Sequence, residues 1–187
     1  LITQNNIDPN EIGRVYLGTE SAVDGSKPTA TYAVEIVEKE LSQTYGERSF
    51  KNCDILDMTF ACVGAVDALH NSLDWVKQDI NRKAVLIASD LSKYDINSTG
   101  EYTQGAGAVA VLVSHNPSIL SIDKTWGIAS KSEGDFFKPR RTYKKSELLK
   151  SVLTELKIDA SKEAIKTFIE STSSGFWSDR NELVEVF

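Results

Sequence analysis

The sequence is poor in the residue types that mark metal sites and disulfide frameworks. Its 187 residues include only two cysteines, Cys53 and Cys62, and two histidines, His70 and His115. Their number and spacing do not fit a zinc site, so no metal is expected. Two cysteines in a chain without a recognisable signal peptide are not expected to form a disulfide. We therefore expect a cytoplasmic protein.

Long apolar runs and broad basic clusters are also missing. No run reaches the roughly 18 apolar residues that a membrane-spanning helix requires, so no membrane partner is expected. The formal net charge is −6, and the one basic cluster, at residues 138–145, is interpreted as a solvated loop. Nucleic-acid binding favours a clustered basic surface, so no nucleic-acid partner is expected. Hydrophobic residues make up 41% of the chain, which is enough for a globular core.

The two ends of the chain predict a segment cut from a larger protein. The chain begins with Leu1 instead of Met, and its first residues are typical of the last turn of a helix. It stops on the apolar alternation of residues 182–187.

Apolar patterning over residues 14–113 predicts alternating strands and helices. Buried strands are predicted at continuous apolar or β-branched runs, at residues 14–18, 53–58, 83–90 and 108–113. Helical spacing of apolar side chains marks residues 29–41 and the segment after Cys62. The apolar face of this second helix is expected to consist of Val66, Leu69, Leu73, Val76 and Ile80. This alternation of strands and helices predicts an α/β fold with a mostly parallel central sheet flanked by helices.

After Pro139 the character of the sequence changes. Two amphipathic helices are predicted at residues 146–156 and 161–170, with Ser161 as the N-cap of the second. We therefore divide the chain into an α/β part, residues 1–139, and a helical insertion or linker, residues 140–187.

Cys62 is the strongest candidate for a catalytic residue. It stands where a buried strand ends and a long helix is expected to begin. The N–H groups and partial positive charge of a helix N-terminus favour the thiolate form. The small residue Gly64, two positions on, leaves room for a substrate to reach the sulfur. A buried structural cysteine is an equally good interpretation of the position alone.

A second candidate, Glu20, lies just past the end of the first predicted strand, where α/β sheets bind their ligands. A carboxylate there can act as a general acid or base, although a solvated turn is the commoner use of such a residue. His70 is eight residues beyond Cys62, roughly 12 Å along a helix, and is too far away to exchange a proton with it. Cys53 starts a strand and is interpreted as structural.

Several ordered segments resemble the hydroxymethylglutaryl-CoA synthase family. They are Gly18-Thr19-Glu20-Ser21 with Asp24 and Ser26-Lys27, Asp57-Met58-Thr59-Phe60-Ala61-Cys62, Ala88-Ser89-Asp90-Leu91-Ser92-Lys93-Tyr94, Thr103-Gln104-Gly105-Ala106-Gly107-Ala108, His115-Asn116-Pro117-Ser118-Ile119-Leu120 and Asp135-Phe136-Phe137-Lys138-Pro139. The resemblance covers roughly residues 1–140. It implies a thiolase-like fold with a helical insertion near the C-terminal end.

The resemblance also implies an acyltransferase of the Claisen-condensing type. Acetyl-CoA would acylate Cys62, and Glu20 would take a proton from the acetyl methyl group. The resulting enolate would attack acetoacetyl-CoA to give 3-hydroxy-3-methylglutaryl-CoA, an early step of the mevalonate route to isoprenoids. Tyr94 and Thr103 match positions that line the substrate site. The CoA thioesters are substrates, no cofactor is implied, and family members typically form homodimers.

The sequence departs from the family in several places. Val63 replaces the tyrosine that often follows the nucleophile, and the family's first strand, its catalytic histidine segment and the rest of its second half have no counterpart here. Three alternatives stay open: a β-ketoacyl carrier-protein synthase, a homologue that acts in polyketide β-branching, and a non-catalytic dimerisation fragment.

Overall fold

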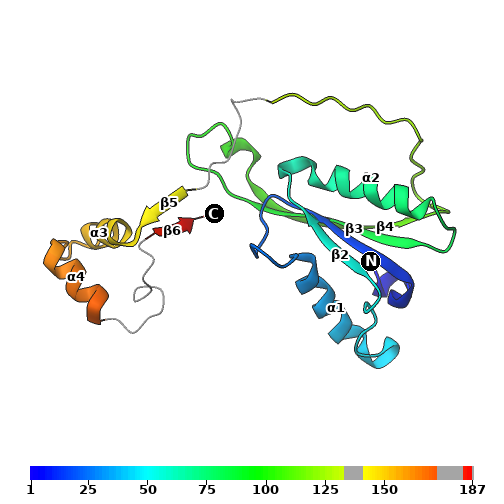
Figure 1. Ribbon diagram of the computed structural model, residues 1–187, viewed down its shortest axis with the longest axis horizontal. Coiled ribbons are helices and arrows are strands. Elements are labelled where there is room, and N and C mark those ends of the chain that lie inside the picture. Colours follow the sequence, from blue (N-terminus) through cyan, green and yellow to red (C-terminus); the bar gives the residue numbers. More distant parts are fainter. Residues whose placement is uncertain (133–140, 172–182, 187) are drawn as a thin grey trace. The chain divides into compact units, whose positions relative to one another are not determined.

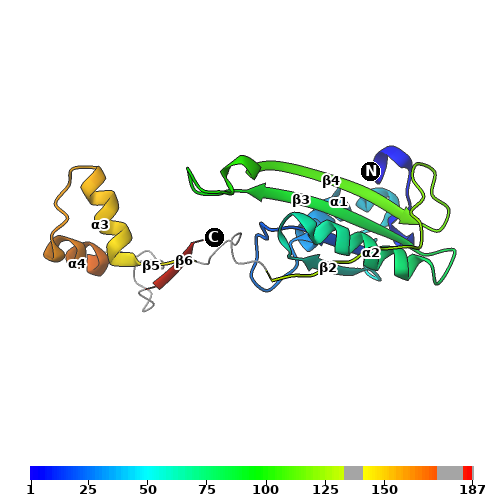
Figure 2. The same ribbon diagram turned by 90° about the horizontal axis from the view of Figure 1, so that it is seen from above.

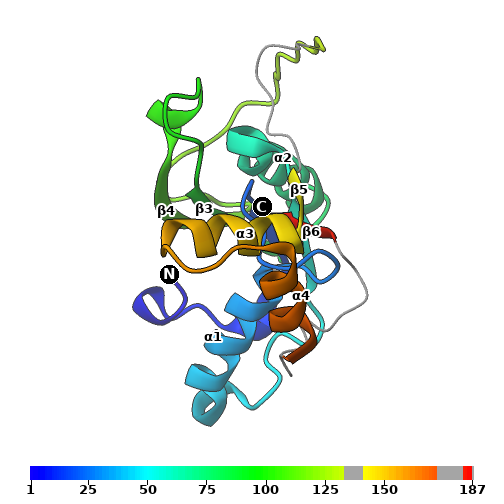
Figure 3. The same cartoon turned by 90° about the vertical axis from the view of Figure 1, so that its left-hand side faces the viewer.

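The chain forms two compact units, Leu1–Ser130 and Lys131–Phe187, in the computed structural model. The structure describes residues 1–132, 141–171 and 183–186 (Figures 1–3). The predicted boundary between residues 139 and 140 lies outside these ranges and stays a prediction. Each unit is described by itself.

The first unit is built on a four-stranded mixed sheet. Its strands are β1 (Ile12–Gly18), β2 (Asp54–Met58), β3 (Lys83–Ser92) and β4 (Gly105–Ser114), and its helices are α1 (Ala30–Tyr45) and α2 (Gly64–Val76). Short 3₁₀ turns lie at Thr3–Asn5, Pro9–Glu11, Ala61–Val63 and Glu101–Thr103. The strand order is β2-β1-β3-β4. β1 runs parallel to β2 and β3, and β4 runs antiparallel to β3. The predicted α/β class and mostly parallel sheet are confirmed.

The sheet is covered on both faces, with α1 on one side and α2 on the other (Figure 1). Alternate residues of β1 therefore enter two different cores. Val15 and Leu17 pack with Val34 of α1, whereas Tyr16 packs with Ala68 of α2. Burial on both faces is the physical reason for the continuous apolar runs that predict β1 and β3.

The buried face of α2 differs from the face expected from its larger apolar residues. The fully buried positions are Gly64, Ala68, Ser72 and Val76. Val66 is 52% exposed, and Ile80 lies beyond the helix end and is 61% exposed, so the predicted face was wrong at these two positions. Small residues allow the helix axis to approach the sheet closely, and Leu69 and Leu73 border this stripe.

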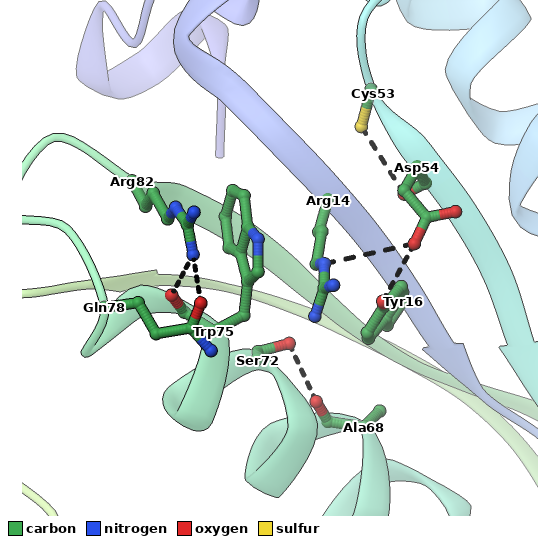
Figure 4. A network of polar contacts seen from close by, with 9 residues as sticks. All are labelled: Arg14, Tyr16, Cys53, Asp54, Ala68, Ser72, Trp75, Gln78 and Arg82. Carbon is green, nitrogen blue, oxygen red and sulfur yellow. Dashed lines mark hydrogen bonds and ion pairs between the residues drawn. The ribbon is translucent and has the colours of Figure 1, made fainter.

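Aromatic and charged side chains hold α2 against β1 (Figure 4). The Arg14 guanidinium lies between two rings, 4.8 Å from the centroid of Trp75 and 5.3 Å from that of Tyr16. The Tyr16 hydroxyl donates a 2.9 Å hydrogen bond to Asp54 of β2. Burial, aided by this hydrogen bond, raises the pKa of Tyr16 to about 12, so the hydroxyl stays a donor.

The N-terminus of α1 is anchored to β2 by one carboxylate. Asp57 accepts hydrogen bonds from the backbone N–H groups of Thr29, at 2.5 Å, and Ala30, at 3.1 Å. An acidic group at a helix N-terminus satisfies unpaired donors and favours the helix dipole, typically by about 1 kcal/mol. This contact fixes the end of the loop that follows Glu20.

Beyond β4 the chain runs back along α2 (Figures 1 and 2). The indole of Trp126 stacks on His70 with 4.3 Å between ring centroids, and the His70 ring also lies 3.7 Å from the Asp74 carboxylate. The structural interpretation of His70 is therefore supported.

The second unit combines two helices with a small strand pair. β5 (Arg141–Lys144) pairs antiparallel with β6 (Leu183–Val186), and α3 (Lys145–Glu155) and α4 (Lys162–Ser171) lie between them in sequence. The predicted helices are confirmed, and the Ser161 hydroxyl accepts a 3.2 Å hydrogen bond from the N–H of Ala164, as expected of an N-cap. The strand pair was not predicted. The interpretation of residues 138–145 as a solvated loop was wrong for the described part, which forms β5 and the start of α3, where Lys145 is only 5% exposed. Among the described residues of both units, no helix is long and apolar enough to cross a membrane.

Candidate active site

The carboxyl ends of the three parallel strands β1, β2 and β3 lie at the same end of the sheet. In the parallel pairs of β1, Gly18 is opposite Met58 of β2 and Ala88 of β3. The chain leaves the sheet after Gly18 and Met58, and β3 continues past Ala88 to Ser92 in the same direction. The residues beyond these positions therefore lie at the carboxyl ends of the parallel strands, where α/β sheets place their ligand sites. Glu20 follows β1, Cys62 follows β2, and Tyr94 follows β3.

Glycines allow β1 and the start of α2 to touch. A Cβ atom on Gly18 would lie 2.0 Å from the backbone nitrogen of Ala65, and one on Gly64 would lie 2.4 Å from the carbonyl oxygen of Met58. Neither position has space for a side chain. This contact determines where the helix begins relative to the strand ends, and with it the place of Cys62.

Cys62 lies in the 3₁₀ turn Ala61–Val63, directly before α2. Its position at a strand-to-helix junction agrees with the prediction, although the α-helix proper begins two residues later. Ala61 has a φ of 36°, in the left-handed region that residues with a Cβ adopt at a cost of about 1 kcal/mol. Cys62 itself is exposed.

The carboxylate of Glu20 faces this thiol. The Cys62 Sγ donates to Oε1 of Glu20 at 3.8 Å. The Ser92 hydroxyl donates to the same oxygen at 2.9 Å, and the Tyr94 hydroxyl donates to Oε2 at 2.7 Å. Both carboxylate oxygens are therefore held by hydroxyl donors, and one of them lies beside the Cys62 thiol.

Asp90 of β3 holds the backbone that carries Glu20. Its Oδ1 accepts hydrogen bonds from the N–H of Glu20 at 2.6 Å, from Thr19 Oγ1 at 2.9 Å and from Ser21 Oγ at 3.2 Å. Ser21 Oγ in turn accepts a 2.8 Å hydrogen bond from the N–H of Leu91. These bonds join the turn after β1 to the end of β3.

Comparison with known proteins agrees with this geometry. A family model described as "Hydroxymethylglutaryl-coenzyme A synthase N terminal" matches residues 1–118. The chain belongs to the hydroxymethylglutaryl-CoA synthase family. The family resemblance predicted from the sequence is thus confirmed.

Individual members of the family show the same relationship. The chain is 35% identical over 145 residues to a hydroxymethylglutaryl-CoA synthase of Haloferax volcanii, a match that covers 76% of this chain and 32% of that protein. It is 34% identical over 132 residues to a synthase of Enterococcus faecalis, covering 71% of this chain and 32% of the relative. The chain therefore spans about a third of the length of these relatives.

The thiolase-like fold is likewise confirmed by a solved structure. The structure, described as MvaS in complex with 3-hydroxy-3-methylglutaryl coenzyme A, is similar to this chain with a TM-score of 0.63 and 33% sequence identity. The match covers 74% of this chain and 31% of that one.

The predicted site residues differ in the contacts that they make. Cys62, Glu20 and Tyr94 are joined by direct contacts. Thr103 is exposed, its hydroxyl donates to the Gly100 carbonyl at 2.8 Å, and it also interacts with Tyr94. Gly64 is buried against Met58, so close packing is what requires a glycine there, and a substrate contact at Gly64 stays a prediction.

Sequence reasoning missed three residues that build the site: Asp90, Ser92 and Ser21. They come together with Glu20 only through the parallel pairing of β1 with β3, which no local pattern in the sequence reports. The sequence does show that Asp90 and Ser92 are polar residues at alternate positions, which point to one face of a strand.

Tyr94 remains a hydrogen-bond donor over the pH range in which enzymes work. Its hydrogen bond to Glu20, together with partial burial, raises the pKa of Tyr94 to about 12. The phenol is therefore protonated at neutral pH and continues to hold Oε2 of the carboxylate.

The two cysteines are expected to differ sharply in reactivity. Burial, reinforced by the neighbouring Asp54 carboxylate, raises the pKa of Cys53 to about 12, so its thiol stays protonated and inert at pH 8 (Figure 4). Cys62 is exposed. Iodoacetamide at pH 8 should label Cys62 at least about tenfold faster than Cys53, as measured by peptide mass spectrometry.

A Cys62→Ser variant provides the matched control, because it should lose the fast-labelled site and leave only slow modification. Comparable rates at both cysteines in the native protein would contradict the assignment of Cys53 to the core.

Proposed function

We propose that the protein is a hydroxymethylglutaryl-CoA synthase that condenses acetyl-CoA with acetoacetyl-CoA. The observation that carries this proposal is the pairing of an exposed thiol with a carboxylate 3.8 Å away, at the carboxyl ends of parallel strands. Family membership supports the same reaction. Because the chain spans only a third of its relatives, the substrates are part of the proposal.

The first step is acetyl transfer to Cys62. The sulfur attacks the thioester carbonyl of acetyl-CoA, a new C–S bond forms, and the bond to the CoA sulfur breaks. The thiol proton leaves with CoA. The backbone N–H of Cys62, near the start of α2, is suited to stabilise the oxyanion of the tetrahedral intermediate.

The second step forms the carbon–carbon bond. Glu20 takes a proton from the methyl group of acetyl-Cys62, and the electron pair of the broken C–H bond moves into the thioester enolate. The enolate carbon attacks the ketone of acetoacetyl-CoA, and the resulting alkoxide takes up a proton. Water then cleaves the Cys62 thioester and releases 3-hydroxy-3-methylglutaryl-CoA. None of these reaction steps needs a cofactor.

The decisive experiment is acetyl labelling of the full-length protein. Incubation with radiolabelled acetyl-CoA is expected to place about one acetyl group on each chain, at Cys62, and a Cys62→Ser variant is expected to take up none. Wild-type protein without label, or label that persists in the variant, would refute the proposal.

A competition between acceptors tests the substrate class. The acetylated protein should release product with acetoacetyl-CoA and be slow with an acetoacetyl group on a carrier protein. The reverse preference would favour a homologue in polyketide β-branching, and acetylation without either product would favour a non-condensing role.

We also propose that the protein forms a homodimer and works in the cytoplasm. β4 is an edge strand of the sheet, and its Val109 and Val111 are 62% and 43% exposed. Pairing of two such edges would complete the hydrogen bonds of the strand and set the apolar side chains beside their counterparts on the partner strand.

A further inference from the structure

We propose that Ser92 is a positioning residue that keeps Oε1 of Glu20 directed at the substrate carbon held by Cys62. This inference rests on the proposed function, since it assigns a role within the same reaction. Ser92 is the last residue of β3 and is only 8% exposed. Because Ser92 belongs to the sheet and is buried, its backbone is fixed and its hydroxyl stays close to the Glu20 carboxylate.

The argument begins with the two oxygens of Glu20. Oε1 is the oxygen that lies 3.8 Å from Cys62 Sγ, and it is the oxygen to which Ser92 Oγ donates at 2.9 Å. Oε2 is held by the Tyr94 hydroxyl at 2.7 Å. A carboxylate with a hydroxyl donor on each oxygen cannot rotate about its last side-chain torsion without breaking both of these hydrogen bonds. Loss of the Ser92 bond removes the hydroxyl that holds Oε1, the oxygen nearest the sulfur, and leaves the Tyr94 bond on Oε2.

β3 contacts both the backbone and the carboxylate of Glu20. Asp90 and Ser92 are two positions apart and therefore point to the same face of the strand. Asp90 accepts from the Glu20 backbone N–H at 2.6 Å, and Ser92 donates to the carboxylate. The strand thus determines where the residue sits and how its carboxylate is turned.

The hydrogen bond of Ser92 is compatible with proton transfer. A carboxylate oxygen has two lone-pair directions, so Oε1 can keep the Ser92 bond along one and take the methyl proton along the other. The C–H bond of acetyl-Cys62 breaks, an O–H bond forms on Oε1, and the Ser92 proton stays on Oγ. Loss of this bond should therefore affect enolate formation and not acetyl transfer.

The test compares two steps in the full-length protein. We expect Ser92→Ala to acetylate Cys62 like the wild type, with an unchanged KM for acetyl-CoA. Exchange of solvent deuterium into the acetyl methyl group should fall about tenfold, the loss typical of one hydrogen bond to a charged group. Ser92→Thr retains the hydroxyl and should recover most of the exchange rate. Ser89→Ala, three positions earlier on the opposite face of β3, serves as the control and should exchange at the wild-type rate.

The outcomes separate this inference from the proposed function. Wild-type protein that never acquires an acetyl group refutes the synthase reaction and this role with it. Normal acetylation with wild-type exchange in Ser92→Ala refutes the positioning role alone. An equal fall in acetylation and exchange would make Ser92 a support of the fold, which also overturns the inference.

Discussion

Replacing Glu20 by alanine is expected to slow condensation by about 10³-fold while Cys62 still accepts an acetyl group. The reason is that acetyl transfer uses the sulfur, whereas removal of a methyl proton needs a base. Without the carboxylate, the hydroxyls of Ser92 and Tyr94 have lost their shared acceptor and cannot take a proton themselves. Single-turnover experiments that follow acetyl-enzyme and product separately would measure the two steps.

A Glu20→Gln variant separates the base from the scaffold. The amide keeps the shape of the side chain and one oxygen acceptor for the surrounding hydroxyls, but it cannot accept the methyl proton. We expect it to be as slow in condensation as the alanine variant. Recovery of activity in Glu20→Gln, or an equal loss of both steps in Glu20→Ala, would assign Glu20 a structural role.

Replacing Gly18 by alanine is expected to lower the free energy of unfolding by about 3 kcal/mol or more. The added Cβ would lie 2.0 Å from the nitrogen and 2.3 Å from the Cα of Ala65. Both atoms belong to the backbone of α2, so no side-chain rotation can relieve the clash. The helix must shift away from β1, which opens the core around Ala68 and displaces Cys62. Urea denaturation monitored by circular dichroism would measure the loss.

Gly25→Ala is the matched control. Nothing lies within 4 Å of a Cβ at Gly25, so its free energy of unfolding should change by less than about 1 kcal/mol. If the two alanine variants had the same stability, the close contact between β1 and α2 would not be a constraint of the fold.

The sequence predicts those parts of the fold that depend on local pattern. The apolar runs of β1 and β3 are continuous because both faces are buried, and such runs are visible without any structure. The buried stripe of α2 was predicted less well, because close approach to the sheet selects small residues. Ala68 and Ser72 carry little hydrophobic signal, whereas the larger Val66 faces away from the core.

The site was predictable to the extent that its residues follow strand ends. The ends of strands made Cys62 and Glu20 candidates, but that position alone left a structural role open for each, and the family resemblance assigned their roles. Their contact depends on which strands are neighbours. Asp90 and Ser92 were missed for the same reason. Their partners are 70 and 72 positions away in sequence, and no local pattern reports a hydrogen bond over that separation.

The central place of β1 has a consequence for folding. Glu20 is 42 positions from Cys62 and 72 from Ser92, so the thiol, the carboxylate and its hydroxyl donor come together only after β1 has paired with strands on both sides. Parallel pairings of this kind close long loops before they gain any contact, which makes them slow to form. A nascent chain therefore carries both the base and the thiol before the two are neighbours. The geometry of the site is therefore complete only when both pairings of β1 are in place.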